Sequence, residues 1–417
     1  MKTFLGITIL YFFCVTLAFG QTTITLEECE SLFRKNNFLL LAEEFNISAS
    51  EAAVIQARIW ELPALSGELN AYNPEKNKAF DVGQAGQKSV QIQQLIYLGG
   101  KKKSEVAFAK SNVEIARLQF EQLLRNLRYQ LRESFYSIHY DLIKARNTSI
   151  QLANVDSLVI AYSRESKRGN VPLKDVVRLQ SLALDIKNEL INIQASIYAE
   201  QGMLKILSGI QDEIIPSIDE TVLQTNYNKV VPFTLEQLQL TMLEKNPQSI
   251  IFQKIMQNND LYLRWQKAQA VPDLTLGTSY DQRGGAFQNQ VNLTVGIPLA
   301  LWNRNKGNIY MAKAEQSKGV LLKDQKVLEM KSKLETAYKT LLFQQEQYNK
   351  LSENTSHNLE VVYSGTLQNF QKRNISLIEF TDFMESYNQS IQLVNEMRKQ
   401  IIIKGEGINL LVNEEVF

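Results

Sequence analysis

The sequence contains one pattern twice, with an offset of about 209 residues. Thr25-Leu26-Glu27 begins a helical pattern that stops at Pro63, and Thr234-Leu235-Glu236 begins a second one that stops at Pro272. Each proline precedes alternating apolar and polar residues, then a turn, and then a very long helical run. A period this long is not that of a short-repeat solenoid. We therefore expect one symmetric architecture built from two helix–strand–strand–helix–helix units.

The two units define the expected domain organisation and a fold that is mainly α with a small β part. We expect a signal peptide at 1–20, a first repeat at 21–209, a linker at 210–233 and a second repeat at 234–417. The expected strands lie at about 65–72, 89–97, 274–281 and 290–297, and the hairpin tips at about 168–175 and 372–379.

The N-terminus is typical of an export signal. Lys2 supplies a positive charge, Phe4 to Leu17 is apolar, and Ala18-Phe19-Gly20 fits a small-residue cleavage site. A bulky Phe13 precedes Cys14, so we do not expect lipid attachment there. Cleavage near Gly20 would leave Cys29 as the one cysteine and exclude a disulfide within the chain.

The longest uninterrupted segment, from Lys101 to about Lys167, contains neither proline nor internal glycine. As a helix it would reach about 100 Å. Its apolar residues recur at spacings of three, four or seven, which predicts a coiled-coil seam; they are Phe120, Leu124, Leu127, Leu131, Ile138 and Leu142. The returning arm from Pro172 is shorter by nearly half. We therefore expect the segment from Phe38 to Trp60 to stack end to end with that arm.

Four strands with one apolar face are too few to close a barrel within one chain. Because open sheet edges cannot face lipid, the strands must close against other chains. Aromatic residues flank the strand pairs and predict anchors at a membrane interface: Trp60, Tyr97, Trp265 and Trp302. The alternative is ordinary packing between helix ends and strands.

Residue patterns typical of enzymes and metal sites are missing from the sequence. His139 and His357 lie far apart, and no Cys–His spacing fits a metal ion. There is also no glycine-rich phosphate loop and no nucleophile elbow. We expect each histidine to be a polar residue on a helix surface, and a protein that is no enzyme and needs no cofactor. The net charge of +1 gives no support to nucleic-acid binding.

Together these features resemble the TolC family of outer-membrane efflux proteins over nearly the whole mature chain. The turns Gly169–Val176 and Arg373–Phe380 look like the family's G-x-x-x-(I/L)-x-(D/E)-(V/F) tips, although Arg373 replaces the tip glycine. The segment Ile297–Ile309 is similar to the strand-to-helix junction of the CzcC and CusC branch, the outer-membrane members of heavy-metal efflux systems.

The resemblance implies a homotrimer whose strands form one 12-stranded barrel among outer-membrane lipids, above a periplasmic tunnel of helices. A periplasmic adapter and an inner-membrane RND-type pump would then be its partners, with heavy-metal cations as a candidate cargo. The implied adapter-docking residues are Gly169, Asn170, Val171, Pro172, Leu173, Arg373, Asn374, Ile375, Ser376 and Leu377.

Acidic residues just past the tips give a candidate pore constriction. Glu379 and Asp382, with a contribution from Asp175, would form a carboxylate ring in a trimer. The alternative for Glu379 is a capping box with Ser376, because acidic residues favour the first turn of a helix. The run from Lys101 to Lys103 has two interpretations as well: the solvated start of a helix, or a contact with lipid phosphates.

Two other functions remain open at this point. Ducts of this type also serve type I protein secretion, which the sequence does not separate from efflux. A soluble periplasmic coiled-coil adapter is the third hypothesis, but such an adapter would not need two duplicated strand pairs.

Overall fold

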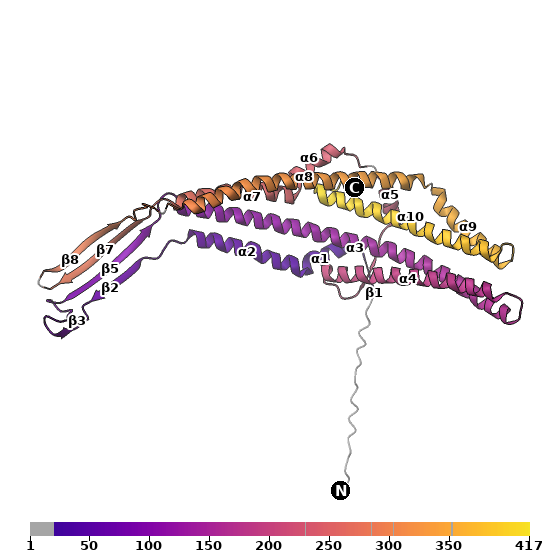
Figure 1. The fold of residues 1–417 in the computed structure, drawn as a ribbon, viewed down its shortest axis with the longest axis horizontal. Helices are drawn as coiled ribbons and strands as arrows, with labels where there is room; N and C mark the ends of the chain where they lie inside the picture. The colour runs from indigo at the N-terminus through magenta and orange to yellow at the C-terminus, as the bar shows by residue number, and fades with distance from the viewer. Residues whose placement is uncertain (1–20, 230, 285, 303, 352) are drawn as a thin grey trace, which may run out of the picture.

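The computed structural model describes residues 21–417 apart from 230, 285, 303 and 352, and it leaves out the side chains of 21 and 353–357. The expected signal peptide, including Cys14, lies outside the described residues. Figure 1 shows a long, gently curved molecule with a sheet at one end and two helical hairpin tips at the other. Short elements lie on both sides of the long helices near the middle of the molecule.

The first repeat runs from the middle of the molecule to the sheet, along its whole length to a tip, and back. Its elements are β1 (Gln21–Ile24), α1 (Leu26–Asn36), α2 (Phe38–Arg58), β2 (Ala64–Leu69), β3 (Tyr72–Asn73), β4 (Lys78–Ala79), β5 (Gln87–Ile96), α3 (Lys101–Lys167) and α4 (Leu173–Ser208). Helix α3 spans 67 residues without a break, as the absence of proline and internal glycine predicts.

The second repeat follows the same path after β6 (Glu213–Pro216) and α5 (Glu220–Tyr227). It comprises α6 (Leu235–Lys245), α7 (Pro247–Gln269), β7 (Leu274–Arg283), β8 (Phe287–Gly296), α8 (Lys306–Lys350), α9 (Glu353–Gln371) and α10 (Leu377–Val412). Its long arm is thus two helices, α8 and α9, where the first repeat has only α3.

The main sheet has four antiparallel strands in the order β2–β5–β7–β8. One row across it joins Leu65, Ile92, Thr278 and Leu293, while the next row joins polar residues such as Gln91 and Asn292. Because side chains alternate along a strand, one face of the sheet is apolar and the other polar. The apolar face is exposed in the single chain: Leu293 is 86% exposed.

Each repeat pairs a long arm with a composite one, as the arm lengths predict. Helix α3 packs against both α2 and α4, which follow each other along it, and α8 packs against both α7 and α10. Side by side, the order is α2/α4, α3, α7/α10 and α8/α9 (Figure 1).

An asparagine joins the two parts of each composite arm. The Asn37 side chain accepts from Leu40 N at the start of α2 and donates to Leu207 O at the end of α4. In the second repeat, the Asn246 side chain accepts from Gln248 N and donates to Leu411 O. One side chain therefore caps two helix ends that would otherwise leave backbone groups unpaired.

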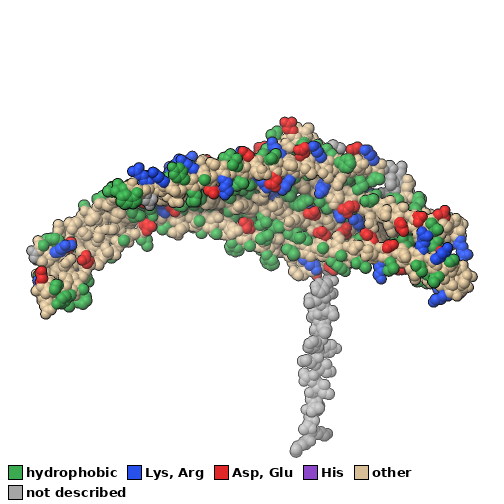
Figure 2. Space-filling model, in the orientation of Figure 1, with side chains coloured by type: hydrophobic (Ala, Val, Ile, Leu, Met, Phe, Trp, Pro, Cys, Tyr) green, Lys and Arg blue, Asp and Glu red, His purple; other side chains and the backbone are tan. Residues whose placement is uncertain are grey.

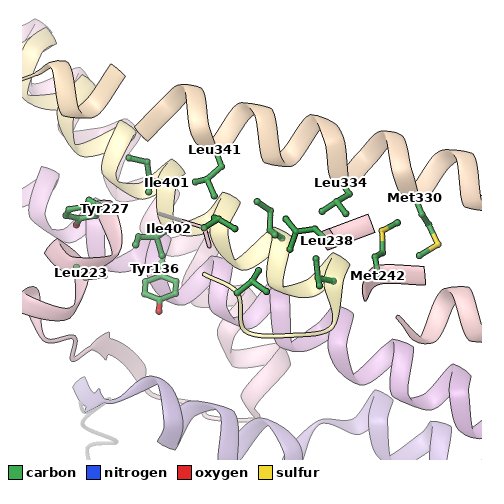
Figure 3. Packing of buried hydrophobic residues seen from close by; sticks show 14 of the residues in the cluster. Tyr136, Leu223, Tyr227, Leu238, Met242, Met330, Leu334, Leu341, Ile401 and Ile402 are labelled. Atoms are coloured by element: carbon green, nitrogen blue, oxygen red, sulfur yellow. The ribbon is translucent and has the colours of Figure 1, made fainter. Parts of the chain in front are cut away.

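The largest apolar cluster lies where the second repeat meets α3 and α5. Figure 3 shows Leu341 of α8 facing Ile401 and Ile402 of α10, and Leu334, two turns away on α8, close to Leu238. A separate cluster of the first repeat contains Leu127, Leu131 and Ile138 of the predicted seam, together with Cys29. Among the described residues, no helix combines the length and apolar composition that a membrane span requires.

Candidate functional site at the helical tips

Both tips adopt the same turn although their residues differ. Gly169 has φ 81° and Arg373 has φ 64°, so both residues lie in the left-handed region. Asn170 N donates to Glu165 O over 3.0 Å, and Asn374 N donates to Asn369 O over 2.9 Å. The arginine therefore follows the glycine's backbone path, and the substitution does not change the turn.

The returning helix begins differently in the two tips. Pro172 is the N-cap of α4 and makes no side-chain cap, whereas Ser376 caps α10. Glu379 N donates to Ser376 Oγ over 3.2 Å, and Ser376 N donates to a Glu379 carboxylate oxygen over 2.8 Å. These bonds form the predicted capping box and lower the pKa of Glu379.

A shared apolar core holds the two tips together. The rings of Phe370 and Phe380 stack with centroids 4.3 Å apart, and Tyr162 of α3 stacks on Phe370 at 5.7 Å. Leu179 of α4 is fully buried in the same cluster. Both tips are thus one packed unit, with aromatic residues from each repeat.

An ion pair joins the two returning helices just beyond the turns. Arg178 Nη2 lies 3.9 Å from Asp382 Oδ1, and both side chains are largely exposed. Each residue stands nine positions after its tip residue, Gly169 or Arg373, so the two repeats carry opposite charges at matching positions. No local pattern identifies Arg178 in the sequence, although alignment of the two repeats at their tips places it opposite Asp382.

The three candidate constriction residues stand six to nine positions after the tip residue of their own repeat, but their surroundings differ. Asp382 is exposed and faces Arg178, Glu379 is exposed and engaged in its cap, and Asp175 is half-buried. Asp175 lies near Tyr162, whose pKa is raised by burial and then by this carboxylate.

The candidate docking residues divide into exposed and partly buried ones. Leu173 is 69% exposed, whereas Ile375 and Leu377 pack against the tip core. The equivalent surface of the second tip is provided by Ile378, which is 55% exposed. Most other tip residues are exposed: Gly169, Asn170, Pro172, Arg373, Asn374 and Ser376, with Val171 half-buried.

The aromatic residues near the sheet do not share one environment. Trp60 and Trp302 are exposed, and Tyr97 packs on Trp60 with centroids 5.6 Å apart. Trp265 instead lies in α7, where its ring stacks on Phe108 of α3 at 5.5 Å. Its place corresponds to ordinary helix packing, the alternative interpretation of these residues.

One expectation about polar residues was wrong, and one of two open interpretations does not hold. His139 is not on the surface: its side chain is 12% exposed, Nε2 lies 3.4 Å from Glu220, and burial lowers its pKa. For the lysine run, the interpretation as a solvated helix start does not hold for Lys101, because Lys101 is buried and pairs with Asp273 over 2.6 Å. His357 lies outside the described side chains. Within the described part of the chain, no group of three potential metal ligands occurs.

Comparisons with known proteins agree with this architecture. Residues 31–209 match the family model "Outer membrane efflux protein". The chain is 24% identical over 292 residues to the cobalt-zinc-cadmium resistance protein CzcC of Cupriavidus metallidurans. The aligned segment covers 69% of this chain but only 66% of that relative.

Solved structures show the same fold. CusC, described as forming a transmembrane channel, superposes with a TM-score of 0.75 at 14% identity, covering 93% of this chain and 91% of CusC. The CmeC outer membrane channel of Campylobacter jejuni gives a TM-score of 0.76 at 11% identity, covering 94% of this chain and 86% of CmeC.

Proposed function

We propose that the protein is the outer-membrane exit duct of a tripartite efflux system, because residues 31–209 belong to the outer membrane efflux protein family and the chain has the fold of CusC and CmeC. In this proposal the chain is exported, lies in the outer membrane and reaches into the periplasm. It is a passive conduit rather than an enzyme.

One observation carries the proposal: the sheet and the helices end at the same two edges. Strand β2 and the arm α2/α4 form one edge, and strand β8 and the arm α8/α9 form the other. An edge strand presents unpaired N–H and C=O groups. Copies that join edge to edge therefore extend the sheet and the row of helices at the same contact. A closed ring with rotational symmetry requires such a contact.

A ring of three copies contains twelve strands, and each edge strand pairs with an edge strand of the next copy. The exposed apolar face of the sheet then contacts lipid, since backbone groups inside a membrane must pair within the protein. The polar face lines the duct. Trp60, Tyr97 and Trp302 are the proposed interface aromatics, and Trp265 is not among them.

At the opposite end, the tips are the proposed docking surface for a periplasmic adapter, which connects the duct to an RND-type pump. Leu173 and Ile378 provide exposed apolar contacts there. The relative CzcC is named for cobalt, zinc and cadmium resistance, which supports metal cations as the cargo.

The decisive experiment measures the mass and the membrane attachment of the purified protein. We expect extraction only with detergent and a mass of three chains. A soluble adapter would leave the membrane without detergent, and a stable monomer would contradict closure by edges. Deletion of a neighbouring RND pump gene or a neighbouring ABC exporter gene then separates efflux from type I secretion, by loss of metal tolerance or of a secreted protein.

Acidic residues at the tips are the proposed constriction of the duct. Three-fold repetition places several carboxylates around one axis, and such rings concentrate cations. We expect Asp382→Ala with Glu379→Ala to raise single-channel conductance in planar bilayers and to weaken cation preference. Ser376→Ala is the matched control, because it removes the cap of α10 and keeps both carboxylates. Unchanged ion selectivity in the double variant would contradict a constriction at these residues.

A further inference from the structure

Helix α3 begins with three lysines, which is unfavourable beside the positive end of a helix dipole. Two of them are compensated within the chain. Lys101 pairs with Asp273, and Lys102 pairs with Glu105 over 3.0 Å and lies 5.2 Å from the centre of the Tyr97 ring. Lys103 is exposed and pairs with no described acidic residue.

Lys103 belongs to a groove of about 450 Å³ between the end of α2 and the first turns of α3. Lys102, Lys110 and Arg58 line the same groove, and Trp60 forms one wall. Lys103 and Lys110 stand seven residues apart, on one face of α3. As with Lys103, no ion pair to Arg58 or Lys110 occurs among the described residues. Four cationic groups therefore converge on one hollow, three of them without an acidic partner.

The groove continues into the apolar surface of the sheet. From Trp60, half exposed, the chain passes Leu62 and Leu65, which are 83% and 73% exposed. Leu65 lies on the apolar face, in the row that joins Ile92 and Leu293. A molecule with an anionic head and a long apolar tail matches both parts, whereas a free anion would match only the groove.

The second repeat shows that the fold does not need these lysines. Counted from the left-handed residues that precede each long helix, Gly100 and Asn305, Lys103 corresponds to Asn308 and Lys110 to Glu315. Lys103 and Lys110, which have no acidic partner among the described residues, thus have no basic counterpart at the matching positions of the second repeat. On the second repeat, hydrophobic and basic side chains also lie side by side where the helices join the sheet (Figure 2).

We propose that the groove lined by Arg58, Lys102, Lys103 and Lys110 binds the phosphate headgroup of an anionic phospholipid, whose acyl chains lie along the apolar face of the sheet. The site rests on the proposed insertion of the sheet into a membrane. Clusters of basic residues at a membrane surface attract anionic lipids, and tryptophan is common at the depth of the headgroups. A trimer would carry three such sites.

The test uses the purified, delipidated trimer and native mass spectrometry. It compares phosphatidylglycerol with phosphatidylcholine of identical acyl chains. We expect up to three phosphatidylglycerol molecules per trimer, bound at least about tenfold more tightly than phosphatidylcholine. Lys103→Asn with Lys110→Gln should remove this preference. Lys103→Arg with Lys110→Arg should keep it, and so should the control Lys339→Gln with Lys350→Gln, which removes two charges far from the sheet.

Three results would overturn the site. Equal affinity for the two lipids, or an unchanged preference in the Lys103→Asn, Lys110→Gln variant, would show that the groove does not select anionic lipid. Displacement of the bound lipid by millimolar inorganic phosphate would show that a free anion is the ligand. A chain that never enters detergent micelles or phosphatidylglycerol vesicles would contradict the duct itself, which separates that failure from failure of the groove.

Discussion

Arg373, at the second tip, has a strained backbone conformation. Arg373 adopts the left-handed conformation that Gly169 adopts in the first tip, and the backbone hydrogen bonds of both turns agree. For a residue with a side chain this conformation costs roughly 1–2 kcal/mol. The turn is therefore imposed by the packing of the hairpin below it, not by the preference of the residue.

Replacing Arg373 with glycine should stabilise the protein by about 0.5–1 kcal/mol, because relief of backbone strain exceeds the flexibility that glycine adds to the unfolded chain. The reverse test is Gly169→Ala, which should destabilise by about 1 kcal/mol. Denaturant unfolding of the detergent-solubilised protein measures both. A loss of stability in the glycine variant would show that the Arg373 side chain makes a stabilising contact in the assembled protein.

Single residues were predictable where their partners are local. The capping box of Ser376 and Glu379 follows from a spacing of three residues, and the structure contains it. His139 is partly buried, and its ion-pair partner Glu220 comes from α5, far along the chain. Arg178 and Asp382 meet only because the two hairpins pack together. Such long-range proximity has no signature in a local pattern.

Among the elements, the joint within each composite arm depends most on one side chain. Asn37 is 3% exposed and bonds to both α2 and α4, and Asn246 does the same for α7 and α10. The composite arm was predictable from lengths alone, since a helix of 36 residues cannot span one of 67. The break between α8 and α9 was not predicted, because no proline or glycine marks it.

Asn37→Ala should destabilise the protein by about 2–3 kcal/mol, and Asn246→Ala by a similar amount. Each change removes an N-cap, worth about 1 kcal/mol, and leaves a carbonyl of the adjoining helix without its donor. Asn46→Ala on the exposed face of α2 is the control and should cost less than about 0.5 kcal/mol. Thermal or denaturant unfolding tests the series. Equal stability of all three variants would mean that water replaces the asparagine at the joints.

At the scale of the whole molecule, one edge carries an unpartnered seam. Along α4, the exposed apolar residues recur every seven positions: Val177, Leu184, Ile191 and Tyr198. The opposite edge carries Leu321 and Leu328 on α8, also seven apart and exposed. A heptad of apolar residues is the pattern that packs against another helix. Both edges therefore carry exposed apolar residues of the kind that the proposed ring of copies would bury.

Leu184→Asp with Ile191→Asp should prevent trimer formation, because two charges would be buried in the seam between copies. Asn192→Asp, at an exposed position on the same helix but about 100° around it from Ile191, should leave the trimer intact. The mass in detergent distinguishes the two outcomes. If the double variant remains a trimer, α4 does not lie at the contact between copies.

The sheet and the helices end at the same two edges of the chain, and this arrangement also has a genetic consequence. In a ring closed by unlike edges, every copy takes part in two contacts, so one faulty copy opens a gap that runs from the lipid to the tips. A cell that makes equal amounts of normal and edge-defective chains would assemble only about one ring in eight from normal copies alone, if the chains mix at random. Edge mutations should therefore be dominant, whereas mutations that merely prevent folding should be recessive.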